Sequence, residues 1–367
     1  MTLIAERPVD RRAPAIPATM STIIGVGTAV TGPSVTQAEL LGLMDIEDPK
    51  IRSIFLNSAI DRRNLSLPPP DDTGVRRSEP QGQLLAKHKR LAVEMGSQAL
   101  QACLKQAGAA LSDLRHLCCV TSTGFLTPGL SALLIKELGI DPGCSRSDVV
   151  GMGCNAGLNA LNVVAGWSAA HPGELAVVLC AEACSAAYAI DGSMRTAVVN
   201  SLFGDGSAAL ALRNDGPGGS AGPRILKFAS LLISDAIDAM RYDWDNDQGR
   251  FSFFLDPQIP YVVGAHAESV VDRLLSGTGL RRSDIGHWLV HSGGKKVIDA
   301  VVVNLGLSRH DVRHTVGVLR DHGNVSSGSF LFSYERLVNE AVAKPGEYGV
   351  LMTMGPGSTI ETALVQW

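Results

Sequence analysis

The chain has 367 residues, of which 45% are hydrophobic, 19% charged and 5% aromatic, and its formal net charge is -4. This composition is typical of a globular enzyme and excludes a disordered or collagen-like chain. Because 32 basic residues are balanced by 36 acidic ones, overall charge predicts no binding to nucleic acid, and an anionic ligand must be held by a local cluster.

The sequence also bears on location and cofactors. Charged residues and prolines interrupt residues 1–20, so no signal peptide is expected. No apolar run reaches the roughly 18 residues of a membrane span, so we expect a cytoplasmic protein without a membrane partner. Seven cysteines without a Cys-x-x-Cys pair favour neither a disulfide framework nor a structural zinc site, so no metal is expected.

The first third of the chain is predicted to hold two irregular segments and three helices. Residues 1–20 are expected to form a flexible tail, and residues 66–83 a long polar loop. Helices are predicted over residues 36–43, 49–60 and 84–107. Gly25-Val26-Gly27 is expected to follow a strand, but it lacks the third glycine and the helix of a dinucleotide-binding loop.

The order of short motifs after residue 115 repeats in the second half of the chain. The first series is a strand at 116–122, a glycine-rich start at 151–154 of a helix to about 170, Pro-Gly-Glu at 172–174, a strand at 175–181 and Gly-x-Gly-Ser at 204–207. The second series is a strand at 287–291, a helix from 322–324 to about 343, Pro-Gly-Glu at 345–347, a strand at 348–353 and Gly-x-Gly-Ser at 355–358. The repetition predicts a duplicated α/β fold with halves at 21–215 and 222–367.

The duplication predicts which polar residues meet. Cys154 and Asn324 stand at equivalent helix starts, and His291 ends the second-half strand that corresponds to 116–122. All three are therefore expected to converge where the halves meet, which is a usual place for a ligand cleft.

Cys154 is the expected nucleophile. A helix start and a nearby imidazole favour the reactive thiolate, and the flanking glycines leave the backbone open to substrate. A buried structural cysteine, a core histidine at His291 and a helix cap at Asn324 are the alternative interpretations. Asp205 and Glu182 are expected to brace turns. The cysteines expected to be structural are Cys103, Cys118 and Cys119.

Five motifs together resemble the type III polyketide synthases, the family of chalcone synthase. They are Gly-Met-Gly-Cys-Asn-Ala-Gly at 151–157, Leu-Phe-Gly-Asp-Gly-Ser at 202–207, His-Ser-Gly-Gly-Lys-Lys at 291–296, Gly-Asn-Val-Ser-Ser at 323–327 and Gly-Pro-Gly-Ser-Thr-Ile-Glu at 355–361. The resemblance covers about residues 20–367. It implies the five-layered αβαβα thiolase fold and a homodimer that acts on CoA thioesters without a metal or a bound organic cofactor.

The resemblance implies a mechanism. Cys154 would carry the growing acyl chain as a thioester, while His291 and Asn324 hold the malonyl-CoA carbonyl and stabilise the enolate formed as carbon dioxide leaves. The sequence of residues 241–249 and the Lys295-Lys296 pair after Gly294 most resemble bacterial members of the family that serve antibiotic pathways. The expected product is 3,5-dihydroxyphenylacetyl-CoA from four malonyl-CoA units. Tetrahydroxynaphthalene and alkylresorcinol chemistry are the alternatives within the family.

The motif positions also imply a cavity wall and a CoA site. The expected cavity residues are Ser122, Thr123, Cys184, Phe203, Phe253 and Ser326, with Ala187 at a position where plant members have threonine. The plant basic cluster for CoA is kept at Lys50, while its two partners match Ser53 and Asn57, so Arg52, Arg62 or Arg63 would substitute. Thr127 stands where plant members place a methionine that reaches the partner subunit.

Three rival functions remain open at this stage. A fatty-acid initiation synthase has the same three catalytic residue types and an acyl carrier protein as its partner. A papain-like hydrolase also has Cys, His and Asn in that chain order, but the duplication and the missing Cys-Gly-Ser-Cys-Trp signature disfavour it. A non-enzymatic scaffold that has kept the fold is the third.

Overall fold

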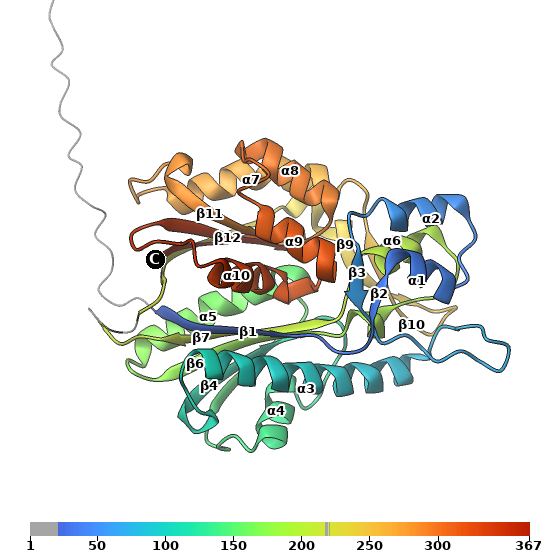
Figure 1. Ribbon diagram of the computed structural model, residues 1–367, viewed down its shortest axis with the longest axis horizontal. Coiled ribbons are helices and arrows are strands. Elements are labelled where there is room, and N and C mark those ends of the chain that lie inside the picture. Colours follow the sequence, from blue (N-terminus) through green and yellow to red (C-terminus); the bar gives the residue numbers. More distant parts are fainter. Residues whose placement is uncertain (1–20, 217–218, 220) are drawn as a thin grey trace, which may run out of the picture.

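A computed structural model describes residues 21–216, 219 and 221–367 of the chain (Figure 1). The expected tail at 1–20 lies outside the described residues. The strands are β1 (Thr22–Ala29), β2 (Ser34–Thr36), β3 (Arg62–Asn64), β4 (Leu114–Val120), β5 (Ser145–Val149), β6 (Leu175–Glu182), β7 (Gly206–Arg213), β8 (Arg224–Leu232), β9 (Met240–Asp245), β10 (Arg250–Leu255), β11 (Ile285–Val290), β12 (Tyr348–Gly355) and β13 (Thr359–Gln366). The helices are α1 (Gln37–Leu43), α2 (Pro49–Leu56), α3 (Gln81–Gln106), α4 (Leu130–Leu138), α5 (Ala156–Ala170), α6 (Met194–Leu202), α7 (Ile259–Leu275), α8 (Lys295–Leu305), α9 (Arg313–His322) and α10 (Ser329–Glu340).

The same sheet topology occurs twice. One nine-stranded sheet has the order β11-β12-β13-β8-β1-β7-β6-β4-β5. Its two parts are joined only where β8 meets β1, at the single pair Thr22 and Arg224. The series β1-β7-β6-β4 and β8-β13-β12-β11 have matching strand directions, with two antiparallel pairings followed by one parallel pairing. The repeated motifs of the sequence therefore belong to repeated structural elements.

The helices and the two parts of the sheet form five layers (Figure 1). Helices α7 and α8 cover the outer face of one part, α3 and α4 cover the outer face of the other, and α5 and α10 lie between them. Strand β6 shows why, since Val177 and Leu179 face α3 while Val178 and Cys180 face the middle layer. This period of two on a strand buried on both faces produces a continuous apolar run. The αβαβα arrangement is as expected.

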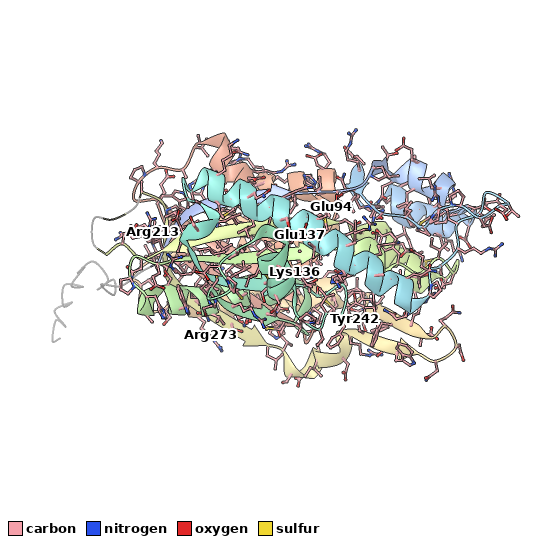
Figure 2. All side chains as sticks on the ribbon, turned by 90° about the horizontal axis from the view of Figure 1, so that it is seen from below. Glu94, Lys136, Glu137, Arg213, Tyr242 and Arg273 are labelled. Carbon is pink, nitrogen blue, oxygen red and sulfur yellow. The ribbon has the colours of Figure 1, made fainter. Side chains whose placement is uncertain are left out.

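Helix α3 packs directly on β1, and this contact corrects one prediction. Gly25 and Gly27 lie inside β1 and not after a strand. A Cβ on Gly27 would come within 2.3 Å of the Cys103 backbone nitrogen on α3. The glycines are therefore needed for the close approach of helix and strand. Seen from below, α3 crosses the lower face of the molecule, with Glu94 on its surface (Figure 2).

Several predicted boundaries differ from the structure by a few residues. Helix α2 ends at Leu56 and not at residue 60, and α10 ends at Glu340 because Ala341 is left-handed with φ of 54°. The two helix starts of the middle layer are each preceded by a 3₁₀ turn, at Gly153–Asn155 and at Ser326–Gly328. In the part of the chain that the structure describes, none of the helices is long and apolar enough to span a membrane.

Candidate active site

Cys154 lies in the 3₁₀ turn that leads into α5 and is only 7% exposed. The preceding Gly153 has φ of 70°, and a Cβ there would lie 2.5 Å from the Pro356 ring on the loop between β12 and β13. Only glycine fits this left-handed and crowded position without strain. The motif at 151–157 in the first half therefore packs directly against the motif at 355–361 in the second half, beside the Cys154 sulfur.

The Cys154 sulfur has two polar neighbours from the second half of the chain. Its Sγ lies 3.5 Å from the Ser326 hydroxyl, and the side chain of Asn324 is near enough to act on the pKa of the thiol and lower it. Burial raises the pKa of the Cys154 thiol to about 12, and the nearby charge of Glu182 acts in the same direction. The Cys154 thiol is therefore harder to ionise in this setting than the thiol of an exposed cysteine.

Asn324 is held firmly by its backbone. Its N–H donates to the Leu202 carbonyl at 2.9 Å, and its carbonyl accepts from the Gly204 N–H at 3.0 Å. The side-chain Oδ1 accepts from the Ser326 N–H at 2.9 Å. Because the oxygen is used inside the protein, the amide nitrogen is the atom left to point at the sulfur and at an incoming ligand.

His291 follows β11 and is 2% exposed. Burial lowers the pKa of its imidazole to about 3, so the ring is neutral near pH 7 and can donate one N–H. The next residue, Ser292, donates to the Gly323 carbonyl at 3.2 Å and so ties His291 to the loop of Asn324. Among the described residues, Cys154 and Asn324 are brought into contact, whereas no hydrogen bond joins His291 to Cys154.

A narrow cavity opens beside the thiol. The centre of a water-sized sphere can occupy only about 30 Å³ of it. The cavity is lined by Ser122, Thr123, Gly153, Cys154, Cys184, Ala187, Val199, Phe203, Tyr242, Phe253, Ser326 and Pro356. The six residues expected at a substrate cavity are among them. Val199 on α6 and Tyr242 on β9 are not among the expected cavity residues, although Tyr242 lies in the stretch 241–249 that carries part of the family resemblance.

Aromatic rings close one side of the cavity. The rings of Phe203 and Phe253 meet edge to face with centroids 5.8 Å apart, and Tyr242 lies 5.0 Å from Phe253. Tyr242 stands on the hairpin of β9 and β10, drawn in yellow (Figure 2). The alternation of β9 side chains across the hairpin could have placed Tyr242 on the cavity face, had the hairpin itself been predicted.

Two buried carboxylates brace the loops around the cavity, as expected. Glu182, at the end of β6, accepts four hydrogen bonds from Ser122, Thr123 and Ser327. Asp205 accepts from the backbone N–H of Ser66 and from both the N–H and the hydroxyl of Ser185. In residues 21–216, 219 and 221–367, no group of three or more His, Cys, Asp or Glu side chains is arranged to hold a metal ion.

The basic residues considered for CoA separate into exposed and buried ones. Lys50, Arg52 and Arg62 are exposed on α2 and β3. Arg63 is one of the expected substitutes in the basic cluster, and this prediction is wrong because its side chain is fully buried. Its guanidinium donates to the side chains of Gln37 and Tyr188 and to two backbone carbonyls, which leaves it no access to a phosphate.

Comparison with known proteins gives a consistent result. The family model of the N-terminal domain of chalcone and stilbene synthases matches residues 83–216, and that of their C-terminal domain matches residues 246–367. The chain is 81% identical over 343 residues to a 3,5-dihydroxyphenylacetyl-CoA synthase of Amycolatopsis balhimycina, which covers 94% of this chain and 92% of that protein. It is 80% identical over 350 residues to the synthase of the same name from Streptomyces toyocaensis, covering 94% and 90% of the two chains.

A solved structure of a bacterial enzyme has the same fold as this chain. The 1,3,6,8-tetrahydroxynaphthalene synthase of Streptomyces coelicolor A3(2), a bacterial type III polyketide synthase, superposes with a TM-score of 0.85 at 27% identity, covering 94% of this chain and 99% of that one. The similarity therefore extends over both halves and includes the residues that surround Cys154.

Proposed function

Because this chain belongs to the chalcone and stilbene synthase family of type III polyketide synthases, which are acyltransferases, we propose that it condenses malonyl-CoA into 3,5-dihydroxyphenylacetyl-CoA. The observation that carries the product is the 80–81% identity to three bacterial synthases of that name. The thiol beside a narrow, mostly apolar cavity supports the same chemistry, since a polyketide chain must grow there away from water.

The proposed reaction begins with acyl transfer. The Cys154 sulfur attacks the thioester carbonyl of the starter, CoA leaves with the electron pair of the broken bond, and a Cys154 thioester remains. Malonyl-CoA then binds with its thioester carbonyl facing His291 and Asn324. As carbon dioxide departs, their N–H groups stabilise the enolate oxygen. The new carbanion attacks the Cys154 thioester, the sulfur leaves as a thiolate, and the lengthened chain remains on CoA until it is transferred back to Cys154 for the next extension.

The proposed product is a short chain that closes to one ring. One malonyl unit serves as starter and three as extenders, and each of the four loses one carbon dioxide, the starter included, which gives an eight-carbon tetraketide. Joining its terminal carbon to the third carbon from the thioester, followed by aromatisation, leaves a six-membered ring with a two-carbon thioester arm. Phe203, Phe253 and Tyr242 line the cavity beside Cys154 in which this chain would fold.

Product analysis tests this function. The purified protein is incubated with malonyl-CoA as sole substrate, and the products are separated and weighed by mass spectrometry. We expect the dihydroxyphenylacetyl thioester or its hydrolysed acid. A five-unit naphthalene product, or a strict requirement for a long-chain starter or for an acyl carrier protein, would contradict the proposal.

We assign the CoA phosphates to Lys50, Arg52 and Arg62. All three are exposed and come from α2 and the neighbouring strand β3. Arg52 keeps part of its guanidinium engaged with the Ile46 carbonyl, at 2.9 Å, so its remaining N–H groups are the ones available to a phosphate. No resident metal or organic cofactor is required by the proposed steps.

The quaternary and cellular setting follows from the family resemblance. We propose a cytoplasmic homodimer with Thr127 at or near the partner subunit. The loop of Thr127 carries an exposed Phe125, which is 70% accessible in the isolated chain and is suited to burial against a partner. The residues at 21–215 and 222–367 form the two thiolase-like halves in this proposal. The pathway served is that of dihydroxyphenylglycine in antibiotic biosynthesis.

A further inference from the structure

The end of helix α6 is held by side chains from β3 and α1. A helix leaves its last carbonyl groups without partners inside the helix, so other parts of the chain must provide them. Arg63 Nη1, on β3, donates to the Asn200 carbonyl at 2.7 Å and to the Phe203 carbonyl at 2.6 Å. The Gln37 amide, on α1, donates to the Ser201 carbonyl at 2.9 Å. These two side chains therefore fix the end of α6 in place.

The segment that Arg63 holds is also the segment that holds Asn324. The Leu202 carbonyl accepts from the Asn324 N–H at 2.9 Å, and the Gly204 N–H donates to the Asn324 carbonyl at 3.0 Å. Phe203 and Asn324 are thereby paired as in a parallel sheet. The backbone of Asn324 therefore lies where the end of α6 places it.

Arg63 also packs directly on the residue that precedes Asn324. Strand β3, drawn in blue, runs beside α9, which ends at His322 and leads into Gly323 (Figure 1). Gly323 has φ of 70°, and a Cβ there would lie 2.6 Å from Arg63 Cδ. Only glycine allows the arginine side chain to pass this close. Arg63 thus contacts both the segment that pairs with Asn324 and the residue before it.

Stability alone does not explain a guanidinium at this place. Arg63 is completely buried, and its hydrogen bonds go to two carbonyls, an amide and a phenol, all of them neutral. Burying a charge against neutral acceptors costs free energy, although the partial negative charge at the end of α6 offsets part of that cost. Burial lowers the pKa of Arg63, while the nearby charge of Asp205 acts in the other direction. The feature that an apolar side chain could not replace is the fork of donors.

We propose that Arg63 is a positioning residue for decarboxylation, which holds the Asn324 amide at the place where it donates to the enolate oxygen of malonyl-CoA. This inference rests on the proposed function in taking Asn324 as a donor to malonyl-CoA. Arg63 is buried and is not among the residues that line the cavity, so it acts through the end of α6 and through Gly323. No bond to Arg63 forms or breaks in the reaction.

Arg63→Lys separates positioning from binding. Lysine keeps the positive charge and the aliphatic chain, but one ammonium group does not reproduce the two ends of the guanidinium fork that reach Gln37 and the Phe203 carbonyl. We expect kcat for the release of labelled carbon dioxide from malonyl-CoA to fall by about ten- to a hundredfold, because a small displacement of a catalytic donor has an effect of this size. The KM for malonyl-CoA should stay within about twofold of the original.

A double-mutant cycle shows whether Arg63 acts through Asn324. In Asn324→Ala the amide is already absent, so adding Arg63→Lys should slow the release of carbon dioxide by less than about twofold more. An equal loss of rate in both backgrounds overturns the proposal, and so does an unchanged rate in Arg63→Lys alone.

Arg250→Lys is the matched control for the loss of a buried arginine. Arg250 is 4% exposed and its ion-pair partner is Asp191, at 3.7 Å. Because this pair does not hold the end of α6, carbon dioxide release in Arg250→Lys should stay within about threefold of the original. A loss as large as that of Arg63→Lys would mean that any buried arginine has this effect, and would reject the specific role of Arg63.

Hydrogen–deuterium exchange covers a loss of folding. In Arg63→Lys the peptides that contain the Gly204 and Asn324 amides should exchange at least about tenfold faster, while those of β6 keep their rate. Faster exchange throughout the protein would show that Arg63 holds the whole fold and not this loop, which contradicts the proposal. If the unaltered protein releases no carbon dioxide from malonyl-CoA, the proposed function itself is wrong, whereas an active protein that Arg63→Lys leaves unchanged rejects only the role of Arg63.

Discussion

His291 and Asn324 present neutral N–H donors in a buried setting. Replacing either with alanine should slow the release of carbon dioxide from malonyl-CoA by about a hundred- to a thousandfold, because each removes a preorganised donor from the enolate oxygen. Acylation of Cys154 by a starter thioester should fall less. Release of labelled carbon dioxide and acylation of the protein are measured separately for each variant.

The exposed His310 provides a control for these replacements. His310→Ala should change neither rate. If His291→Ala or Asn324→Ala blocks acylation while decarboxylation continues, the division of labour between Cys154 and the two donors is wrong.

Arg62 and Arg63 are neighbours in sequence, but their different burial predicts different roles, in ligand binding for Arg62 and in stability for Arg63. Arg63 is fully buried and donates to Gln37, Tyr188 and two carbonyls. Arg63→Ala leaves a cavity and unpaired acceptors, so the free energy of unfolding should fall by about 3–5 kcal/mol. Arg62→Ala should alter it by less than about 0.5 kcal/mol and instead raise the KM for malonyl-CoA.

Denaturant unfolding of the two variants, together with their steady-state kinetics, gives both quantities. Equal losses of stability would show that Arg63 is not the structural residue. The sequence alone could not separate these two arginines, because β3 has only three residues and its alternation between faces is too short to be recognised.

At the scale of elements, the sequence predicted best where local chemistry determines the structure. The Pro-Gly-Glu and Gly-x-Gly-Ser motifs mark turns whose glycines need unusual backbone angles, as Gly173 and Gly357 do with φ of 80° and 73°. The prediction that Gly25 and Gly27 follow a strand is wrong, because these glycines lie inside β1 and allow its close contact with α3, which lies far along the chain. Val199 and Tyr242 were missing from the predicted cavity for a similar reason, because both are far from Cys154 along the chain and meet it only in the folded protein.

The contact between α3 and β1 leads to a stability prediction. Gly27→Ala would place a methyl group 2.3 Å from the Cys103 backbone nitrogen, so helix and strand must separate, and overpacking of this kind costs about 1–3 kcal/mol. Gly42→Ala on α1 is the control, since no atom lies within 4 Å of the position that its methyl group would take, and α1 should gain about 0.5–1 kcal/mol.

Thermal or urea unfolding compares these two glycine variants. A Gly27→Ala protein as stable as the original would mean that β1 and α3 do not approach as closely as described. Loss of stability in Gly42→Ala would contradict the assignment of that glycine to an open helical position.

At the scale of the whole molecule, the duplicated topology explains why proposed catalytic residues from distant parts of the chain lie close together. Cys154 precedes α5 and Asn324 precedes α10, and these two helices share the middle layer between the two parts of the sheet. The order of motifs predicted this convergence. It did not predict the hydrogen bonds of Ser122 and Ser327 to Glu182, because these side chains come from separate loops around the cavity.

The mass of the protein in solution tests the proposed homodimer directly. Light scattering at micromolar protein concentration should give twice the 38.6 kDa mass of one chain. Phe125→Asp, in the loop of Thr127, should shift the mass toward that of one chain, because a charge would be buried against the partner. The exposed Tyr261→Asp is the control and should leave the mass unchanged. A single-chain mass for the unaltered protein would contradict the dimer.

The central claim is that Cys154 carries the growing acyl chain, and trapping that chain tests it most directly. The protein is mixed with malonyl-CoA, quenched in acid within the first turnovers, digested and analysed by mass spectrometry. We expect acyl adducts on the peptide that contains Cys154 and none in Cys154→Ala, with Cys184→Ala keeping the adducts. Acyl groups on another cysteine, or product formation by Cys154→Ala, would contradict the account.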